Sequence, residues 1–383
     1  MSVLTLALTL PLPTADALGK IVIFLLMLSI LVVLHEAGHF LVARRNGVRV
    51  NDFAVGFGPT LLKWTSPRSG TNYRINLLPI GGYCAMKGED GQTNEAEQQR
   101  EFRASTRATD DNFQSKSPRQ RLSIVVAGPI ANFILAFAIL VMAAVSFGIA
   151  SDREFTTKIG PLSPGSPGAR AGLQVGDDVV AIDGIATTTG DAMVNKIRSS
   201  PGKPLRVTYR RHGISTDVTI VPKPVHEGNK TIGQFGFIRI PEFRRVSPLR
   251  AVPIAATEFL GMVQMQLTGY GQLIGHPAQY GSQVSGVIGM ERAASVYQDL
   301  GWAPYLQLAA MISVALGLLN LLPFPALDGG RAVFILAEML RGRPVEPEKE
   351  ALVHFTGFAV LMVLMVFVAF HDILNLVSGK GVF

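Results

Sequence analysis

The hydrophobic and polar positions along the chain divide it into four long apolar segments separated by polar ones. Crossing the hydrocarbon core of a bilayer takes about 20 helical residues, and each apolar segment is long enough. The second and third carry no charged side chain, and the fourth carries a single histidine, His354. The pattern therefore predicts four transmembrane helices, at residues 21–43, 122–150, 303–322 and 351–370.

The segment that follows the first apolar stretch has a different period. NYRINLL alternates polar and apolar residues, and glycines interrupt the segment at Gly56–Gly58 and Gly81–Gly82. Alternation with a period of two, punctuated by glycine, is typical of strands and turns. We therefore predict a β-region beside the membrane at 51–86, followed by a polar loop at 88–116.

Between the second and third apolar segments lies SPGSPGARAGLQVGDDVVAIDG, residues 163–184, followed by a helix-like stretch and two strand-like runs. This order resembles a PDZ domain over about 155–224, a fold that binds an extended peptide by adding it as a strand. The alternative is a small β-sandwich without a ligand. Residues 225–302 read as a connecting strand with helical or amphipathic pieces.

Composition agrees with a membrane protein. Hydrophobic residues make up 48% of the chain and charged residues 16%, against about 25% charged in soluble domains, and the mean hydropathy is +0.32. The net charge is +7, but the basic residues are dispersed without interleaved aromatics, which excludes nucleic acid as the expected partner. Cys84 is the single cysteine, so no intramolecular disulfide can form.

The positions of the basic residues predict an orientation. Lys and Arg are enriched at the cytoplasmic ends of membrane helices. In this chain, basic residues follow the first apolar segment, precede the second and lie between the third and fourth. This puts 44–121 and 323–350 in the cytoplasm and puts both termini and 151–302 outside. The N-terminus could pass for a signal peptide, but it lacks a basic start, so we expect a retained, exported tail.

The expected fold is a polytopic α-helical membrane protein with four transmembrane helices, a cytoplasmic-side membrane-associated β-region and one extracytoplasmic PDZ-like α+β domain. Its expected parts are the tail and first helix (1–50), the β-region and polar loop (51–121), the second helix (122–150), the PDZ-like domain (151–225), a connecting region (226–302), and the third and fourth helices (303–383).

Candidate chemistry begins inside the first apolar segment, in LVVLHEAGHFLVARR. His35 and His39 are one helical turn apart, so both imidazoles project from one face. That spacing suits Zn²⁺, with Glu36 as general base for a zinc-bound water. A chance H-E-x-x-H is the alternative. Polar groups at mid-bilayer cost several kcal/mol unless they are compensated, so the context favours a metal.

A catalytic zinc needs a third protein ligand, and the best candidate lies in NLLPFPALDGG, at the end of the third apolar segment. Pro323 and Pro325 break the helix there, and Asp328 follows. The alternative is that Asp328 caps the next helix. Alone, the two interpretations are evenly balanced, and the H-E-x-x-H motif favours the ligand.

Four features occur together in order: HEAGH, GPIAN (128–132), the PDZ-like domain, and N-x-x-P-x-P-x-L-D-G from Asn320 to Gly329. This combination resembles the site-2 protease family of intramembrane zinc metalloproteases. It is most similar to the bacterial regulator-of-sigma-E protease group, in a form with one PDZ domain instead of two. The likeness covers nearly the whole chain.

The resemblance implies roles for individual residues. His35, His39 and Asp328 would bind one zinc ion, and Glu36 would be the catalytic acid and base. Asn320 would stabilise the tetrahedral intermediate or position substrate, its alternative being a helix–helix hydrogen bond. The remaining implied substrate contacts are Gly56, Phe57 and Gly58, in a β-loop where an unwound substrate pairs as a strand, with Pro323 and Pro325.

For Gly128 and Asn132 we favour close helix packing over a role near the zinc. The resemblance further implies cleavage of single-span membrane proteins in the bacterial inner membrane, surrounded by lipid, with the active site toward the cytoplasm. Substrates would be anti-sigma factors already trimmed by an upstream site-1 protease, or remnant signal peptides. Two alternatives are a membrane-anchored PDZ scaffold without catalysis and a metal transporter that uses the same residues.

Overall fold

The structure is a computed structural model, and it describes residues 14–88, 111–163, 165–228, 230–281 and 286–377. Most of the expected N-terminal tail and of the polar loop after residue 88 lies outside these ranges. The chain forms two compact units. The first holds most of the apolar helices and the β-region, the second holds the PDZ-like domain, and each is described by itself.

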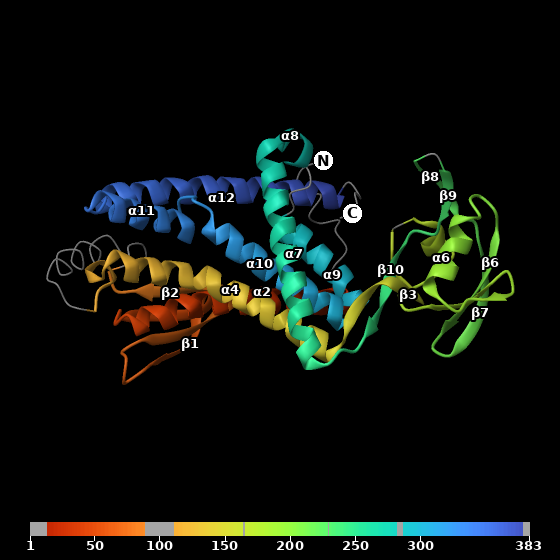
Figure 1. Cartoon of the computed structure of the whole chain (residues 1–383), viewed down its shortest axis with the longest axis horizontal. Helices are drawn as coiled ribbons and strands as arrows, with labels where there is room; N and C mark the ends of the chain where they lie inside the picture. Colours follow the sequence, from red (N-terminus) through yellow and green to blue (C-terminus); the bar gives the residue numbers. More distant parts are fainter. Residues whose placement is uncertain (1–13, 89–110, 164, 229, 282–285, 378–383) are drawn as a thin grey trace. The chain divides into compact units, whose positions relative to one another are not determined.

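Four helices among the described residues are long and apolar enough to cross a membrane, as expected from the hydropathy pattern (Figure 1). The chain is thus a multi-pass membrane protein. Thr14 caps the first helix by accepting a hydrogen bond from the Ala17 N–H at 3.2 Å. The four helices are α2 (Ala15–Arg45), α4 (Pro118–Ser146), α10 (Trp302–Leu321) and α12 (Pro347–Val377).

The end expected for the second helix, residue 150, is wrong. Helix α4 ends at Ser146, and strand β3 (Ile149–Leu162) begins three residues later. Gly148 has a φ of +95°, and a Cβ there would lie 2.5 Å from the Arg244 carbonyl oxygen. This backbone turn ends the helix, although the next two residues, Ile149 and Ala150, are still apolar.

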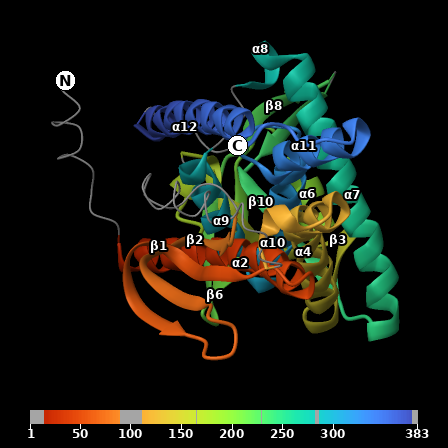
Figure 2. The same cartoon turned by 90° about the vertical axis from the view of Figure 1, so that its left-hand side faces the viewer.

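The β-region forms one antiparallel hairpin of β1 (Val50–Thr65) and β2 (Asn72–Met86), which lies along α2 (Figure 2). The register of the pairing shifts at several points between Val50 and Leu62, including an interruption on either side of Phe57. The buried Asn76 spans this interruption: its Nδ2 donates to the Gly56 carbonyl at 2.9 Å, and its Oδ1 accepts from the Thr60 hydroxyl at 3.0 Å. Large apolar side chains are exposed on the hairpin: Phe57, Leu61, Leu62, Trp64, Leu77 and Leu78.

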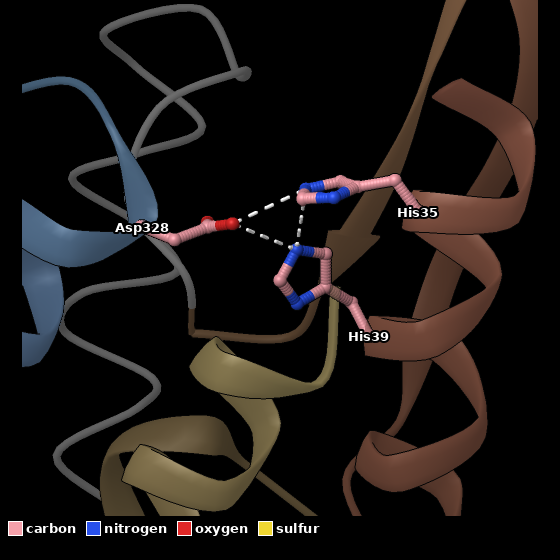
Figure 3. Close-up of side chains that lie close together, drawn as sticks. All are labelled: His35, His39 and Asp328. Carbon is pink, nitrogen blue, oxygen red and sulfur yellow. Dashed lines mark hydrogen bonds and ion pairs between the residues drawn. The ribbon is translucent and has the colours of Figure 1, made fainter. Parts of the chain in front are cut away.

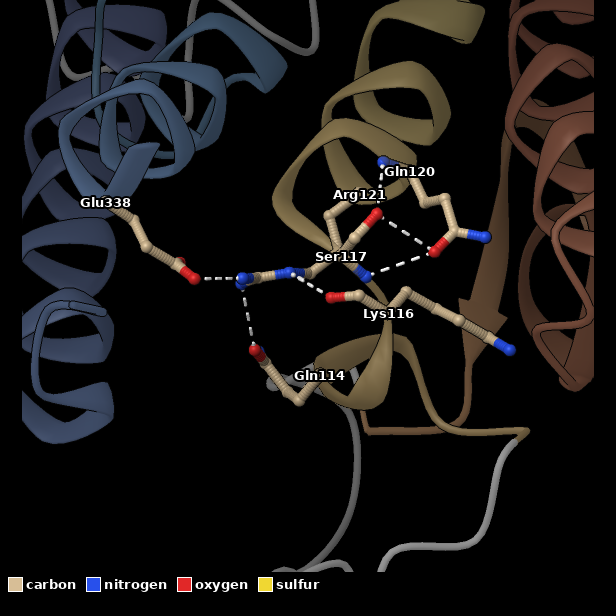
Figure 4. A network of polar contacts seen from close by, with 6 residues as sticks. All are labelled: Gln114, Lys116, Ser117, Gln120, Arg121 and Glu338. Atoms are coloured by element: carbon tan, nitrogen blue, oxygen red, sulfur yellow. Dashed lines mark hydrogen bonds and ion pairs between the residues drawn. The ribbon is translucent and has the colours of Figure 1, made fainter. Parts of the chain in front are cut away.

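Helix α11 (Asp328–Arg341) follows a short loop after α10 and ends at Gly342, which has a φ of +69°. A largely buried ion pair joins it to the start of α4, between the Arg121 guanidinium and Glu338 (Figure 4). Arg121 also donates from Nε to the Lys116 carbonyl at 3.1 Å. This network holds α11 against α4. The apolar core around it consists of Ala43, Val48, Val50, Cys84, Met86, Phe113, Ile124, Val125, Ala332 and Ile335.

The second unit contains a β-rich PDZ-like domain, as expected. A six-stranded sheet has the order β10-β3-β4-β6-β7, with β5 paired to β4. Helix α6 packs on the sheet and is capped by Thr189, which accepts from the Ala192 N–H at 3.2 Å. The edge strand β10 ends at Arg244, so the sheet extends past the expected boundary at 225.

A cavity of about 150 Å³ lies between α6 and the chain around β9 and β10. Val194, Ile197 and Arg198 of α6 line one side, and residues 232–237 line the other. The elements of this part are α5 (Pro167–Arg170), β4 (Asp178–Ile182), β5 (Ile185–Ala186), α6 (Gly190–Arg198), β6 (Leu205–Arg211), β7 (Ile214–Ile220), β8 (Lys223–Glu227), β9 (Lys230–Gln234) and β10 (Phe237–Arg244).

The connecting region after the sheet is mostly helical. In the first unit, Phe259 of α7 contacts Phe133 of α4 edge-on, and the Gln266 side chain donates to the Met311 carbonyl at 2.8 Å. The helices of this region are α7 (Pro248–Gly275), α8 (Pro277–Tyr280) and α9 (Val287–Leu300), and a short 3-10 helix, η1 (Phe113–Ser115), precedes α4.

Candidate metal centre

The two histidines of HEAGH lie on one face of α2, as their spacing requires. Both are 7% exposed, and their ring centroids are 4.8 Å apart with the planes nearly perpendicular. The Nε2 atoms of His35 and His39 point toward each other at 3.2 Å. Figure 3 shows both rings projecting from α2 toward the same point.

The carboxylate of Asp328 reaches that point from α11. Asp328 is the first residue of α11, and the N-cap position belongs to Leu327. The carboxylate therefore does not occupy the capping position that sequence reasoning left open. Instead, its Oδ2 lies 3.1 Å from Nε2 of His35 and 3.3 Å from Nε2 of His39 (Figure 3).

The three atoms have the spacing of ligands around one small cation. Zinc–nitrogen and zinc–oxygen bonds of 2.0–2.2 Å at tetrahedral angles place ligand atoms about 3.3–3.6 Å apart. The observed separations of 3.1, 3.2 and 3.3 Å are close to that. Two imidazoles and one carboxylate are also a donor set that zinc prefers. The residues present fit a zinc ion.

Helix α4 fixes the tautomer of His39. Its Nδ1 lies 2.8 Å from the Ile124 carbonyl oxygen, which can only accept. Nδ1 must therefore carry the proton, and Nε2 of the neutral ring keeps its lone pair directed at the centre. A ligand histidine that donates its other N–H to a carbonyl is the usual outer-shell arrangement in metal sites.

Asn132 plays the corresponding part for His35. Its amide nitrogen lies 3.2 Å from Nδ1 of His35, while its Oδ1 is buried without a hydrogen-bond partner. A half-turn of the amide exchanges the two atoms. Oδ1 then accepts from the His35 Nδ1–H, and Nε2 of His35 keeps its lone pair. The backbone carbonyl of Asn132 is itself held by the Ser313 hydroxyl at 2.8 Å.

Gly128 makes room for both rings. A Cβ at this position would lie 2.2 Å from Nε2 of His39 and 2.7 Å from the His35 ring. GPIAN therefore contacts both histidines directly, through Gly128 and Asn132. Sequence reasoning favoured helix packing for these residues and missed this contact, although a buried Asn in an uncharged membrane helix was a usable signal.

The other expected site residues lie on the same unit. Glu36 is half-buried on α2 beside the histidines, Asn320 is half-buried in the last turn of α10, and Pro325 lies in the loop before Asp328. Pro323 in that loop is exposed. Gly56, Phe57 and Gly58 lie at the interruption of the β1–β2 pairing. The roles of these residues in catalysis and substrate binding stay predictions.

The sequence matches a known protein family and named relatives over most of its length. The model of "Peptidase family M50" matches residues 23–364. The chain is 31% identical to the zinc metalloprotease RasP of Bacillus licheniformis, over 94% of this chain and 100% of that one. It is 30% identical to the regulator of sigma-W protease RasP of Bacillus subtilis, over 94% and 99%. Among solved structures, the PDZ domain of an SdrC-like protein from Listeria monocytogenes matches 24% of this chain and 92% of that one, with 19% identity and a TM-score of 0.19.

Proposed function

Because the chain belongs to peptidase family M50 and is a zinc metalloprotease of that family, we propose that it hydrolyses a peptide bond in the transmembrane segment of single-span membrane proteins. The observation that carries this proposal is the convergence of His35, His39 and Asp328 at 3.1–3.3 Å. The ligands come from apolar surroundings, so the chemistry takes place at membrane depth.

Each residue of the site has a separate role in the proposed hydrolysis. The two histidines and Asp328 would hold a zinc ion, which would supply a Lewis acid and lower the pKa of water at the site toward neutrality. Glu36 takes the proton from the attacking water and delivers it to the leaving amine nitrogen. Asn320 donates from its amide to the developing oxyanion. The Ile124 carbonyl and Asn132 keep the imidazoles oriented throughout.

The hairpin provides a place for an unwound substrate. A helical peptide bond is shielded by its own hydrogen bonds, so cleavage requires an extended backbone whose N–H and C=O groups find new partners. The interruption at Gly56–Gly58 and the exposed Phe57 support substrate pairing beside β1. Pro323 and Pro325 would contact the same substrate.

The name of a relative and the cavity in the PDZ-like domain support a substrate class. The relative from Bacillus subtilis is named a regulator of sigma-W protease. This name supports anti-sigma factors as substrates, after an upstream site-1 protease has trimmed them. Remnant signal peptides are a second proposed group of substrates. The cavity between α6 and residues 232–237, beside the edge strand β10, supports capture of a peptide by the PDZ-like domain. The basic residues support a bacterial inner-membrane location with this domain outside and the metal centre toward the cytoplasm.

The test uses the full chain reconstituted in bilayers with zinc and a single-span membrane protein tagged at both ends. Wild type should release two tagged fragments cut within the span. Glu36→Gln should bind zinc equally and release none, whereas Glu346→Gln, an exposed carboxyl after α11, should cleave normally. Retained cleavage by Glu36→Gln would refute the mechanism.

The same measurements separate the alternatives. A PDZ scaffold would retain the substrate without cutting it, in wild type and Glu36→Gln alike. A transporter would move zinc across the bilayer instead of retaining one ion per chain. Wild type that holds no zinc would refute the metal centre itself.

A further inference from the structure

His354 is a histidine within the apolar helix α12, where polar groups are costly unless they have a function. Its Nδ1 accepts a hydrogen bond from the Ala326 backbone N–H at 2.9 Å. Only an unprotonated nitrogen can accept, so the neutral ring carries its proton on Nε2. Nε2 is buried without a hydrogen-bond partner, and the Glu350 carboxylate is 4.0 Å away. The described contacts of His354 with the chain around Asp328 are the bond to Ala326 and the packing of its ring on Phe334 of α11, with ring centroids 5.5 Å apart.

Ala326 has an unusual backbone. It lies in the loop between α10 and α11, two residues before the ligand Asp328, and its φ is +77°. Left-handed backbone is unfavourable for residues with a Cβ, and such a conformation persists only where the surroundings hold it. The bond from the Ala326 N–H to His354 is one such restraint.

Helix α12 contacts the same loop at a second point. Gly357 lies one turn after His354, and a Cβ on it would be 2.3 Å from Cβ of Pro325 and 2.7 Å from the Pro325 carbonyl oxygen. The glycine thus lets the helix approach the loop closely. This packing contact is independent of the hydrogen bond, and both fix the two residues that precede Leu327 and Asp328.

We propose that His354 is a positioning residue of the metal centre: its bond to Ala326 holds the loop in the turn that directs the Asp328 carboxylate at His35 and His39. Among its described contacts, His354 reaches the metal ligands only indirectly, through this backbone bond and through its ring, which packs against Phe334 of α11. Without it, Ala326 relaxes toward negative φ, and the start of α11 turns with it. The inference rests on the zinc site of the proposed function.

The test measures zinc affinity of the full chain by chelator competition, together with thermal unfolding, so it does not depend on proteolysis. His354→Leu removes the acceptor at similar bulk. His354→Asn keeps an acceptor, because its Oδ1 occupies the place of Nδ1. Phe355→Leu, an exposed neighbour on α12, controls for changes to the helix itself. Ala326→Gly is combined with His354→Leu because glycine adopts positive φ without a Cβ penalty.

We expect His354→Leu to weaken zinc binding by about 10- to 100-fold, as outer-shell changes do, and His354→Asn and Phe355→Leu to change it less than about threefold. Ala326→Gly should restore much of the affinity lost in His354→Leu. Wild-type affinity in His354→Leu overturns the proposal, as does an Ala326→Gly/His354→Leu double variant that folds but stays as weak as the single one. Should His354→Leu not fold, loss of binding in a folded His354→Asn refutes the role. Wild type that binds no zinc refutes the site itself, which is a separate outcome.

Discussion

Replacing Gly128 with alanine should remove zinc binding with little change to the rest of the fold. The new Cβ would lie 2.2 Å from Nε2 of His39, about 1.2 Å short of the 3.4 Å of an ordinary contact. It would also lie 2.7 Å from the His35 ring. The methyl group would therefore lie against both imidazole rings, next to the Nε2 atoms that are directed at the metal position.

The magnitude follows from the tolerance of metal sites. Ligand distances vary by about ±0.2 Å around their preferred values, whereas the overlap at Gly128 demands a shift of about 1.2 Å. If His39 moves, it also loses the bond to the Ile124 carbonyl that fixes its tautomer. If α4 moves instead, the restraints on both histidines move with it. In each case we expect zinc affinity to fall by more than about 100-fold, beyond typical outer-shell effects.

The assay is chelator competition on the purified full chain, with bound zinc counted by elemental analysis and unfolding followed in parallel. Two glycine controls separate packing from metal binding. The nearest atoms to a Cβ on Gly317 would be those of the Phe133 ring, at 2.7 Å, and a Cβ on Gly261 would meet nothing within 4 Å. Gly317→Ala should lower stability and keep zinc, and Gly261→Ala should change neither. A Gly128→Ala variant that binds zinc like wild type would show that this geometry of the centre is wrong.

Two further predictions concern the second histidine and the PDZ-like domain. Asn132→Leu should weaken zinc binding about 10- to 100-fold because His35 loses the acceptor for its Nδ1–H, while Asn132→Asp should keep it; equal affinity of the two variants in the same titration would contradict the outer-shell role. The hydrogen bond from the Thr157 hydroxyl at 2.5 Å, aided by Arg210, lowers the pKa of Asp178. A carboxyl whose pKa is lower in the folded state stabilises the fold at pH values above its unfolded-state pKa. This stabilisation is lost as the pH falls through the folded-state pKa. Protection factors against hydrogen exchange in β3 and β4 of the full chain, which correct for the slower intrinsic exchange at low pH, should therefore fall below about pH 5, and Thr157→Val should flatten that response; an unchanged profile would count against it.

Much of the fold could be predicted from the sequence because hydrocarbon imposes simple rules. A stretch of about 20 apolar residues has few alternatives to a spanning helix, and polar groups inside it need a reason. This logic identified His35, Glu36 and His39 and pointed to Asp328. It failed at the end of α4, because the chain after Gly148 pairs as a strand with Arg244, nearly a hundred residues later. Hydropathy does not register a backbone contact of that kind.

The groups that orient the metal ligands were harder to predict, because they too depend on tertiary contacts. The Ile124 carbonyl restrains His39, yet every residue has a carbonyl, and only packing of α4 on α2 selects this one. His354 reads as a lone histidine until the loop before Asp328 brings the Ala326 N–H to it. The motifs thus name the atoms that contact the metal, while the orientation of those atoms depends on tertiary contacts from two other helices.

Because the metal ligands and the groups that orient them lie on different helices, substitutions outside the two motifs can affect metal binding. Helix α2 contributes two imidazoles, but α4 fixes their tautomers and α12 restrains the loop that carries the carboxylate. A substitution in α4 or α12 that leaves HEAGH and the Asp-Gly-Gly turn intact can therefore abolish metal binding. Conversely, an apolar substitution on the exposed face of either helix should be silent, because it meets only hydrocarbon. The sensitive positions are those that contact the histidines or the loop, wherever they lie in the sequence.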